Sequence, residues 1–322
     1  MLRRFSLLAF AKEWTLPIAI GWGVLSYLVF SSCSFFNVVR PYAWHMVSVI
    51  QPLLIFTMLF LSFCKIDYHA LRPRRMHAWM LLVQCSLFAL LTWLLYDFPS
   101  LFGRVWIEGA MLCLICPTAT AAAVVTQKLQ GDAADVTMYT ILINLSAAVL
   151  VPLAIPLIHP SEGKGFMTSF VLILSKVFPM LICPLLAALL VRYFFPRLHK
   201  LLAASRDLAF YLWAVALSIA MAVTTRSIAH SLCSTSDLVA LALVSLACCM
   251  LQFLVGRKIG KYYGRTISGS QGLGQKNTVF GIWLGYTFFN PVTSLAGGFY
   301  CIWHNLYNTW QMHQMNRHPK QF

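Results

Sequence analysis

Charged residues are scarce in this sequence, and acidic residues are the scarcest. Only 10% of the 322 residues are charged, nine of them Asp or Glu, whereas hydrophobic residues make up 60%. A soluble domain carries about 25% charged residues. Together with a mean hydropathy of +0.75, this composition excludes a soluble globular domain and indicates an all-α protein that crosses the membrane several times.

The sequence also lacks the signatures of common enzymes and pumps. It contains no H-E-x-x-H, G-x-S-x-G or Walker A motif, which argues against hydrolysis and against ATP-driven transport. The ten cysteines fall mostly inside apolar runs and are interpreted as small buried residues. We therefore expect no enzyme activity, no cofactor and no metal site. The net charge of +15 resides in short loops, so we do not expect nucleic acid as a partner.

Apolar runs predict ten membrane spans of about 20 residues. The predicted ranges are 15–33, 43–64, 78–96, 106–129, 133–158, 166–191, 208–226, 238–256, 268–289 and 291–312. With a cytoplasmic N-terminus, 18 of the 24 Lys and Arg residues fall in inner segments and four in outer segments. This bias is typical of a multi-pass protein of the inner, cell membrane with both termini in the cytoplasm.

Ten spans divide into two halves of five, residues 1–158 and 159–322. The first half begins inside and the second outside, so the sequence predicts two inverted five-helix repeats. Spans 4 and 9 occupy the same position in the two halves, and both are interrupted. Paired interruptions of this kind indicate the binding site of a secondary transporter.

In span 4 the interruption is at Pro117, which breaks or kinks a helix, and Thr118 and Thr120 are expected to cap the half-helix that follows. In span 9 it is the glycine-rich and polar stretch 268–278. A proline kink alone would explain span 4, but the matching interruption in span 9 favours two discontinuous helices that cross. The starts of two half-helices, together with Lys276, would then create a positive site suited to an anion.

These interruptions carry motifs that resemble the bile acid:sodium symporter family. The resemblance rests on CPTATAAAVVT (116–126), the following LQGDAA, QKNTVFG (275–281) and FFNPVTSLAG leading into WHN (303–305). It implies a core domain of spans 3–5 and 8–10, in which the broken helices cross. It further implies a panel domain of spans 1, 2, 6 and 7, and a cleft between the two domains where organic anions bind and move by alternating access.

The sequence departs from this family at the sodium ligands. The corresponding positions are Ala122, Ala123, Val136, Thr140, Gly272 and Lys276. Sodium needs several oxygen ligands, but only Thr140 offers a hydroxyl, and Lys276 brings a repelling charge. We therefore expect both sodium sites to be lost, with the Lys276 ammonium in place of a sodium ion. Two mechanisms stay open: Lys276 couples transport to protons by losing its own, or it remains a fixed cation in uncoupled transport.

Four other charged residues lie within or next to spans. Glu108 is expected near the outer interface rather than as a partner of Lys276. Asp132 and Asp135 open span 5, where acidic residues stabilise a helix start, so we interpret both as helix caps first and as relay groups second. Lys176, deep in span 6, either lines the substrate cleft or extends toward the membrane surface.

The sequence thus favours a secondary transporter for a carboxylate or sulfonate, working in the lipid bilayer without sodium. Its expected substrate-binding residues are Thr118, Thr120, Ala121, Asn277 and Thr278. The alternatives are a transporter-like sensor that binds an anion without moving it, and a sodium-coupled symporter with atypical ligands. The sequence leaves open the substrate, the direction of transport and the oligomeric state.

Overall fold

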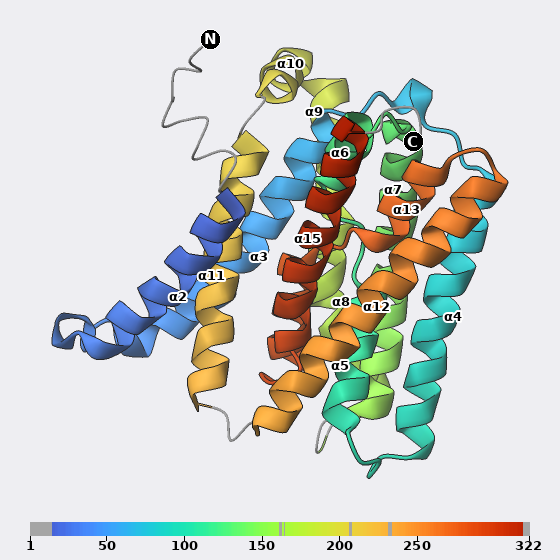
Figure 1. Ribbon diagram of the computed structural model, residues 1–322. Helices are drawn as coiled ribbons and strands as arrows, with labels where there is room; N and C mark the ends of the chain where they lie inside the picture. The colour runs from blue at the N-terminus through green and yellow to red at the C-terminus, as the bar shows by residue number, and fades with distance from the viewer. Residues whose placement is uncertain (1–14, 161–162, 164, 206–207, 231–233, 318–322) are drawn as a thin grey trace.

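The described chain is almost entirely helical (Figure 1). The computed structural model describes residues 15–160, 163, 165–205, 208–230 and 234–317. Its α-helices are α2 (Thr15–Ser32), α3 (Arg40–Cys64), α4 (Arg75–Asp97), α5 (Arg104–Ile115), α6 (Ala122–Lys128), α7 (Ala133–Ile158), α8 (Phe166–Leu181), α9 (Cys183–Phe194), α10 (Pro196–Ala204), α11 (Leu208–His230), α12 (Thr235–Tyr262), α13 (Thr266–Gly274), α14 (Thr278–Phe288) and α15 (Leu295–Arg317). Two short 3-10 helices, Ser34–Phe36 and Tyr68–Ala70, lie in loops.

Each of the ten predicted ranges coincides with one helix or with a consecutive pair of helices. Within the described residues, five helices are by themselves long and apolar enough to cross a membrane, and the pair α8 and α9 makes a sixth if counted as one span. The chain is therefore an all-α membrane protein that crosses the bilayer several times. The ten-span inverted topology stays a prediction, as does the cytoplasmic position of the termini, both of which lie outside the described residues.

Span 6 is not one straight helix. Its two parts, α8 and α9, meet at an angle of 42° around Ile182, which ends one helix and precedes the other. Pro179 and Pro184 flank this point, and each removes a backbone N–H from the helix ladder. The two prolines therefore explain the bend, which the continuous apolar pattern of the span did not predict.

The helices form two neighbouring groups. On one side α2 packs on α11, α11 on α3, and α3 on α8 and α9. On the other side α4 packs on α5 and α7, and α12 packs on α5, α13 and α15 (Figure 1). The first group corresponds to the predicted panel and the second to the predicted core. The division itself stays a prediction of the family resemblance.

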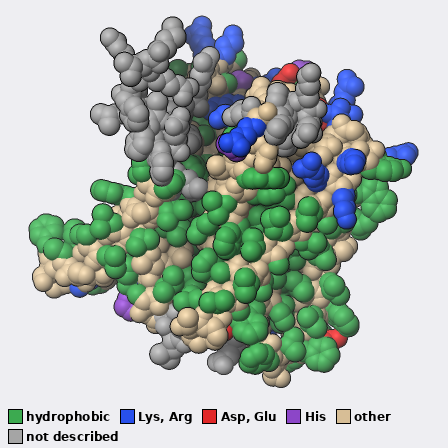
Figure 2. All heavy atoms as spheres, in the orientation of Figure 1, with side chains coloured by type: hydrophobic (Ala, Val, Ile, Leu, Met, Phe, Trp, Pro, Cys, Tyr) green, Lys and Arg blue, Asp and Glu red, His purple; other side chains and the backbone are tan. Residues whose placement is uncertain are grey.

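Lys and Arg side chains gather at one end of the molecule, around α10, and hydrophobic side chains cover much of the rest of this face (Figure 2). Helix α10 itself carries Arg197 and Lys200, two basic residues of a predicted inner loop. We refer to this end of the molecule as the predicted inner end. A charged end beside an apolar band is the surface expected of a protein embedded in lipid.

The interrupted helix α13 approaches α12 very closely. A Cβ atom on Gly256 would overlap the carbonyl oxygen of Gly269, and a Cβ atom on Gly269 would overlap that of Gly256. Glycine at both positions lets the two backbones touch. This contact fixes α13 against the core, next to its break.

Candidate functional site

The two interrupted helices meet at their breaks. Between α5 and α6, and between α13 and α14, the chain is extended, and an antiparallel bridge pairs Thr118 with Lys276. Two backbone hydrogen bonds of 2.8 Å hold the bridge, from the N–H of Ala119 to the carbonyl of Gln275 and from the N–H of Asn277 to the carbonyl of Pro117. We call this paired segment the crossing.

Local chemistry explains where the helices stop and restart. Pro117 disfavours helical backbone at the preceding residue, and Cys116 is accordingly extended, with φ −49° and ψ 129°. Asn277 caps α14, because its side-chain oxygen accepts a hydrogen bond from the N–H of Phe280. The predicted threonine caps of the other half-helix are wrong. Its N-cap is Ala121, which makes no side-chain cap bond.

The carbonyls at the end of α5 are satisfied by an amide from α4. Gln84 donates hydrogen bonds of 2.7 Å to the carbonyl of Leu114 and 3.2 Å to that of Cys116. Its own oxygen accepts a 2.7 Å hydrogen bond from the hydroxyl of Tyr139 on α7. The last carbonyls of a helix have no partner within it, so this Gln–Tyr pair stabilises the break in α5.

A second Gln–Tyr pair serves the crossing from the other half of the chain. Gln252 on α12 donates to the carbonyl of Cys113 and to the hydroxyl of Tyr300 on α15. That hydroxyl in turn donates a 2.7 Å hydrogen bond to the carbonyl of Gly274, the last residue of α13. Helices α4 and α7 correspond in the predicted repeats to α12 and α15. The same pair of residue types therefore recurs at equivalent places.

Lys276 is enclosed at the crossing. The residue is 1% exposed, and within the described residues its Nζ has no hydrogen-bond partner. Its backbone pairs with that of Thr118, which follows the end of α5 by three residues. Cys113 and Cys116 lie at the C-terminal end of α5, where the helix dipole is negative. An ammonium at Lys276 is thus next to the end of a helix that attracts cations.

The positions that match the family's sodium ligands do not fit a sodium ion. Ala122 and Val136 are buried and offer no side-chain oxygen, and neither does the half-buried Ala123. The Thr140 hydroxyl donates its proton within its own helix, to the carbonyl of Val136. A Cβ atom on Gly272 would come within 2.9 Å of the Met80 side chain. Apolar side-chain atoms therefore fill the space next to Gly272, and no room is left there for a ligand.

The expected substrate-binding residues have different surroundings. Thr118 is fully buried, and its hydroxyl donates a 2.6 Å hydrogen bond to the carbonyl of Gly272. Asn277 and Thr278 are also buried, whereas Thr120 is half-buried and Ala121 is exposed. All five lie at the crossing. In this conformation Thr120 and Ala121 are the accessible ones, and the hydroxyl of Thr118 already has a structural partner.

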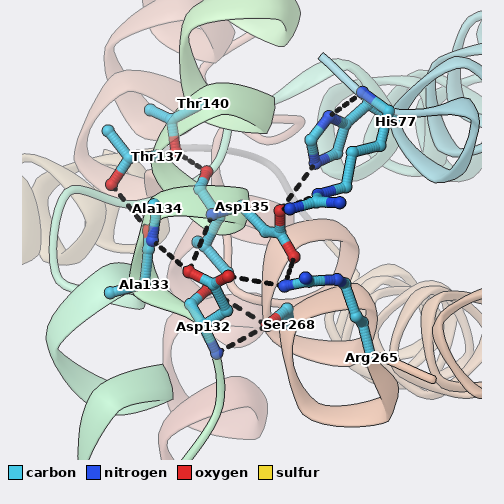
Figure 3. Close-up of polar contacts among 11 residues, drawn as sticks. His77, Asp132, Ala133, Ala134, Asp135, Thr137, Thr140, Arg265 and Ser268 are labelled. Carbon is cyan, nitrogen blue, oxygen red and sulfur yellow. Dashed lines mark hydrogen bonds and ion pairs between the residues drawn. The ribbon is translucent and has the colours of Figure 1, made fainter. Parts of the chain in front are cut away.

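A charged cluster joins three helix starts at the predicted inner end (Figure 3). Asp135, on the first turn of α7, is 3% exposed. Its carboxylate accepts hydrogen bonds from Arg74, just before α4, at 2.9 Å and from Arg265, just before α13, at 2.6 Å. Ser268 of α13 also bonds to the backbone of Asp132. This inner cluster ties the second broken helix to the first half of the chain.

Asp132 caps α7 as predicted, since its carboxylate accepts hydrogen bonds from the N–H groups of Ala134 and Asp135. Partial burial opposes its ionisation. The hydrogen bond from Arg265 and the two backbone bonds outweigh that effect, so the pKa of Asp132 lies below its usual value. Asp132 is therefore a carboxylate at neutral pH, and the cap is fully ionised.

Glu108 belongs to a separate network at the other end of α5. It is 2% exposed and forms an ion pair of 2.9 Å with Arg104. It also accepts a 3.0 Å hydrogen bond from Thr293 and lies 3.1 Å from His159. The carboxylate is thus engaged near the predicted outer end, as expected from the sequence.

The chain was compared with known families and proteins. Residues 52–232 match the model of the Sodium Bile acid symporter family. The chain belongs to this family. The match spans more than half of the sequence and includes α5, α6 and α7, whereas α13 and α14 lie beyond it. None of the curated proteins with which the chain was compared matches it.

Membership of the Sodium Bile acid symporter family agrees with the resemblance carried by the sequence motifs. It indicates a membrane transporter of bile-acid-like or other organic anions, rather than an enzyme. The described helices agree with a multi-pass protein in a lipid environment.

Sequence reasoning missed four residues of this family member's crossing: Gln84, Tyr139, Gln252 and Tyr300. These residues are uncharged and lie outside the two interrupted stretches, which carried the prediction. A usable signal was present, because each glutamine lies in the middle of an apolar span and the two spans correspond in the predicted halves. A buried amide in an apolar helix needs a polar partner, which points to the breaks.

Proposed function

We propose that the protein is a secondary transporter that moves an organic anion by alternating access without sodium. The observation that carries this proposal is the enclosed Lys276, paired through its backbone with Thr118 between two broken helices. Paired discontinuous helices are a recurrent device for binding ions and substrates in secondary transporters.

Lys276 supplies the positive charge that a bound cation would otherwise supply. The C-terminal ends of α5 and α13 both terminate at the crossing, and each helix end carries about half a negative charge. An ammonium between them neutralises this charge without a bound ion. The degenerate ligand positions, Ala122, Ala123, Val136 and Gly272, support the same reading.

The substrate binds on the accessible side of the crossing, at Thr120 and Ala121, with Asn277 and Thr278 behind them. Helices α6 and α14 both begin there. The N–H groups of Ala122, Thr278 and Phe280 already have acceptors, so the positive dipole ends and the remaining first-turn donors attract an anion. The small side chain of Ala121 leaves the backbone open to approach. A carboxylate or sulfonate satisfies these donors, whereas a cation does not.

Contacts between the predicted panel and α14 support two alternating conformations. The Tyr286 hydroxyl donates a 3.0 Å hydrogen bond to Gln51 of α3, and Trp44 of α3 packs edge-on against Tyr286. The Lys176 ammonium of α8 lies over the ring of Phe288. Tyr286 and Phe288 both belong to the last turn of α14, toward the predicted outer end. These contacts close the boundary on that side, and outward opening requires them to separate.

Uptake into proteoliposomes tests the proposal. Purified protein would be offered taurocholate, pyruvate and lactate, with sodium present or replaced by choline. We expect uptake of at least one anion, no change on removing sodium, and strong impairment in Lys276→Gln. Lys128→Gln, which removes a surface-exposed cation at the end of α6, is the matched control and is expected to behave as wild type.

Other outcomes separate the alternatives. A sodium requirement in wild type would contradict the proposal and indicate a symporter with ligands at other positions. Binding without flux would indicate a sensor. An imposed pH gradient then distinguishes the two mechanisms for Lys276, because it accelerates uptake only when transport is coupled to protons.

A further inference from the structure

Lys176 is a second cation within a predicted span, and its surroundings differ from those of Lys276. It is the eleventh residue of α8 and its side chain is exposed. Its Nζ lies 5.7 Å from the ring centroid of Phe288, the last residue of α14. Lys176 therefore reaches from the predicted panel to the end of α14 that lies away from the crossing.

The register of α8 gives the direction of this side chain. The helix buries one face, which contains Ser169, Ile173, Val177 and Met180. Residues seven apart on a helix lie almost in line, so Lys176 is in line with Ser169 and borders the buried face. Ser169 is 5% exposed, and within the described residues its Oγ has no hydrogen-bond partner. Ser169 and Lys176 thus lie on the same side of α8.

Lys276 and Lys176 therefore have different roles. Lys276 is 1% exposed, so its ammonium is closed off from a substrate in this conformation. The side chain of Lys176 is exposed, and among the described residues it lies over the face of the Phe288 ring. A contact between an exposed cation and a ring is weak, and an anion that offers a full negative charge replaces it readily.

We propose that Lys176 is a specificity-determining residue that binds the anionic group of the substrate from the panel side, at the end of α14, before that group reaches the starts of α6 and α14. Its three N–H donors suit a carboxylate or a sulfonate, and it lies over Phe288 when no anion is bound. Lys276 then stabilises the crossing, and Lys176 recognises the cargo. The inference rests on the proposed transport function.

Accessibility of position 176 tests its location without any substrate. Lys176→Cys would be treated in proteoliposomes with a charged, membrane-impermeant thiol reagent, and the wild type would give the background from its native cysteines. The control is Val171→Cys, since Val171 is 54% exposed and lies about 140° around the helix axis from Lys176. We expect modification at 176 and none at 171. Equal resistance at both positions would mean that Lys176 faces lipid and would overturn the proposal.

Transport kinetics test its role. We expect Lys176→Gln to raise KM for the transported anion about tenfold or more, as for loss of a charge-assisted hydrogen bond, with little change in the maximal rate. Lys176→Arg keeps the charge and is expected to retain most of the affinity. A normal KM in Lys176→Gln would overturn this role and leave the proposed transport function intact. Absence of uptake of every probe by the wild type would overturn the transport function, and this inference with it.

Discussion

The hydroxyl of Thr118 donates a 2.6 Å hydrogen bond to the carbonyl of Gly272. The donor belongs to the break between α5 and α6, and the acceptor to the last turn of α13. Carbonyls in the last turn of a helix have no partner within it. A side chain from one interrupted helix therefore completes the other, and each break depends on its counterpart.

Replacement of Thr118 by valine tests this dependence. Valine keeps the shape of the side chain but leaves the buried carbonyl of Gly272 without a donor, which costs about 1–3 kcal/mol. We expect a lower unfolding temperature in detergent, measured by the fluorescence of a thiol or tryptophan reporter. Thr118→Ser keeps the hydroxyl and is the control, expected to lose much less. Equal stability of the valine and serine variants would show that the hydrogen bond contributes nothing.

The two Gln–Tyr pairs predict that the equivalent tyrosines contribute unequally to the stability of the fold. The hydroxyl of Tyr139 donates to the side chain of Gln84, whereas that of Tyr300 accepts from Gln252 and donates to the carbonyl of Gly274. Removing a hydroxyl that satisfies a helix end leaves a backbone group unpaired. We therefore expect Tyr300→Phe to lower the unfolding temperature more than Tyr139→Phe.

Both tyrosines are fully buried, so the comparison is matched for burial and for the chemical change. Thermal unfolding of the two variants side by side measures it. A larger loss in Tyr139→Phe would mean that the Gln84 pair, and not the backbone bond at Gly274, dominates the stability of the crossing.

Local sequence predicts much of this arrangement. Pro117 removes a backbone donor, the run of glycine and polar residues before Lys276 has no apolar face, and Asn277 is a good helix cap. Pro117 and Asn277 mark the two breaks, but most of the interruption predicted at 268–278 is helical, because α13 continues to Gly274. Long apolar runs likewise gave the helix ranges, because a helix in lipid must be apolar along most of its length.

Contacts between segments far apart in the sequence could not be predicted from local sequence. The match of Thr118 with Gly272, of Gln252 with Cys113, and of Arg265 with Asp135 joins residues more than 100 positions apart. Composition gives no register between such segments. The bend at Ile182 was missed for a different reason, since prolines are frequent in membrane helices and only some of them break the axis.

The close contact between α12 and α13 predicts a steric effect. A Cβ atom on Gly269 would overlap the carbonyl oxygen of Gly256, and rigid backbone atoms cannot move aside as a flexible side chain can. Overpacking costs about 1–3 kcal/mol, and we expect Gly269→Ala to reach the upper part of that range. Gly21→Ala is the control, because a Cβ atom there would meet nothing within 4 Å.

Thermal unfolding of the two alanine variants gives the comparison. Because α13 ends at the crossing, we also expect Gly269→Ala to impair anion uptake, whereas Gly21→Ala leaves it unchanged. A stable and active Gly269→Ala variant would contradict the close approach of the two helices.

The enclosed Lys276 predicts that sodium does not stabilise the protein. A ligand that binds only the folded state raises its stability by RT ln(1 + [L]/Kd), which is about 2.7 kcal/mol at a hundredfold excess over Kd. Since Ala122, Val136 and Gly272 offer no side-chain oxygen, we expect the same unfolding temperature in sodium chloride and in choline chloride of equal ionic strength. Lys276→Gln removes the charge and adds a single amide oxygen, while Ala122, Val136 and Gly272 still offer none, so we expect it to be less stable in both salts and still insensitive to sodium. A saturable rise in unfolding temperature with sodium, in wild type or in the variant, would mean that backbone carbonyls at the crossing suffice to bind the ion, and the lysine would then need another explanation.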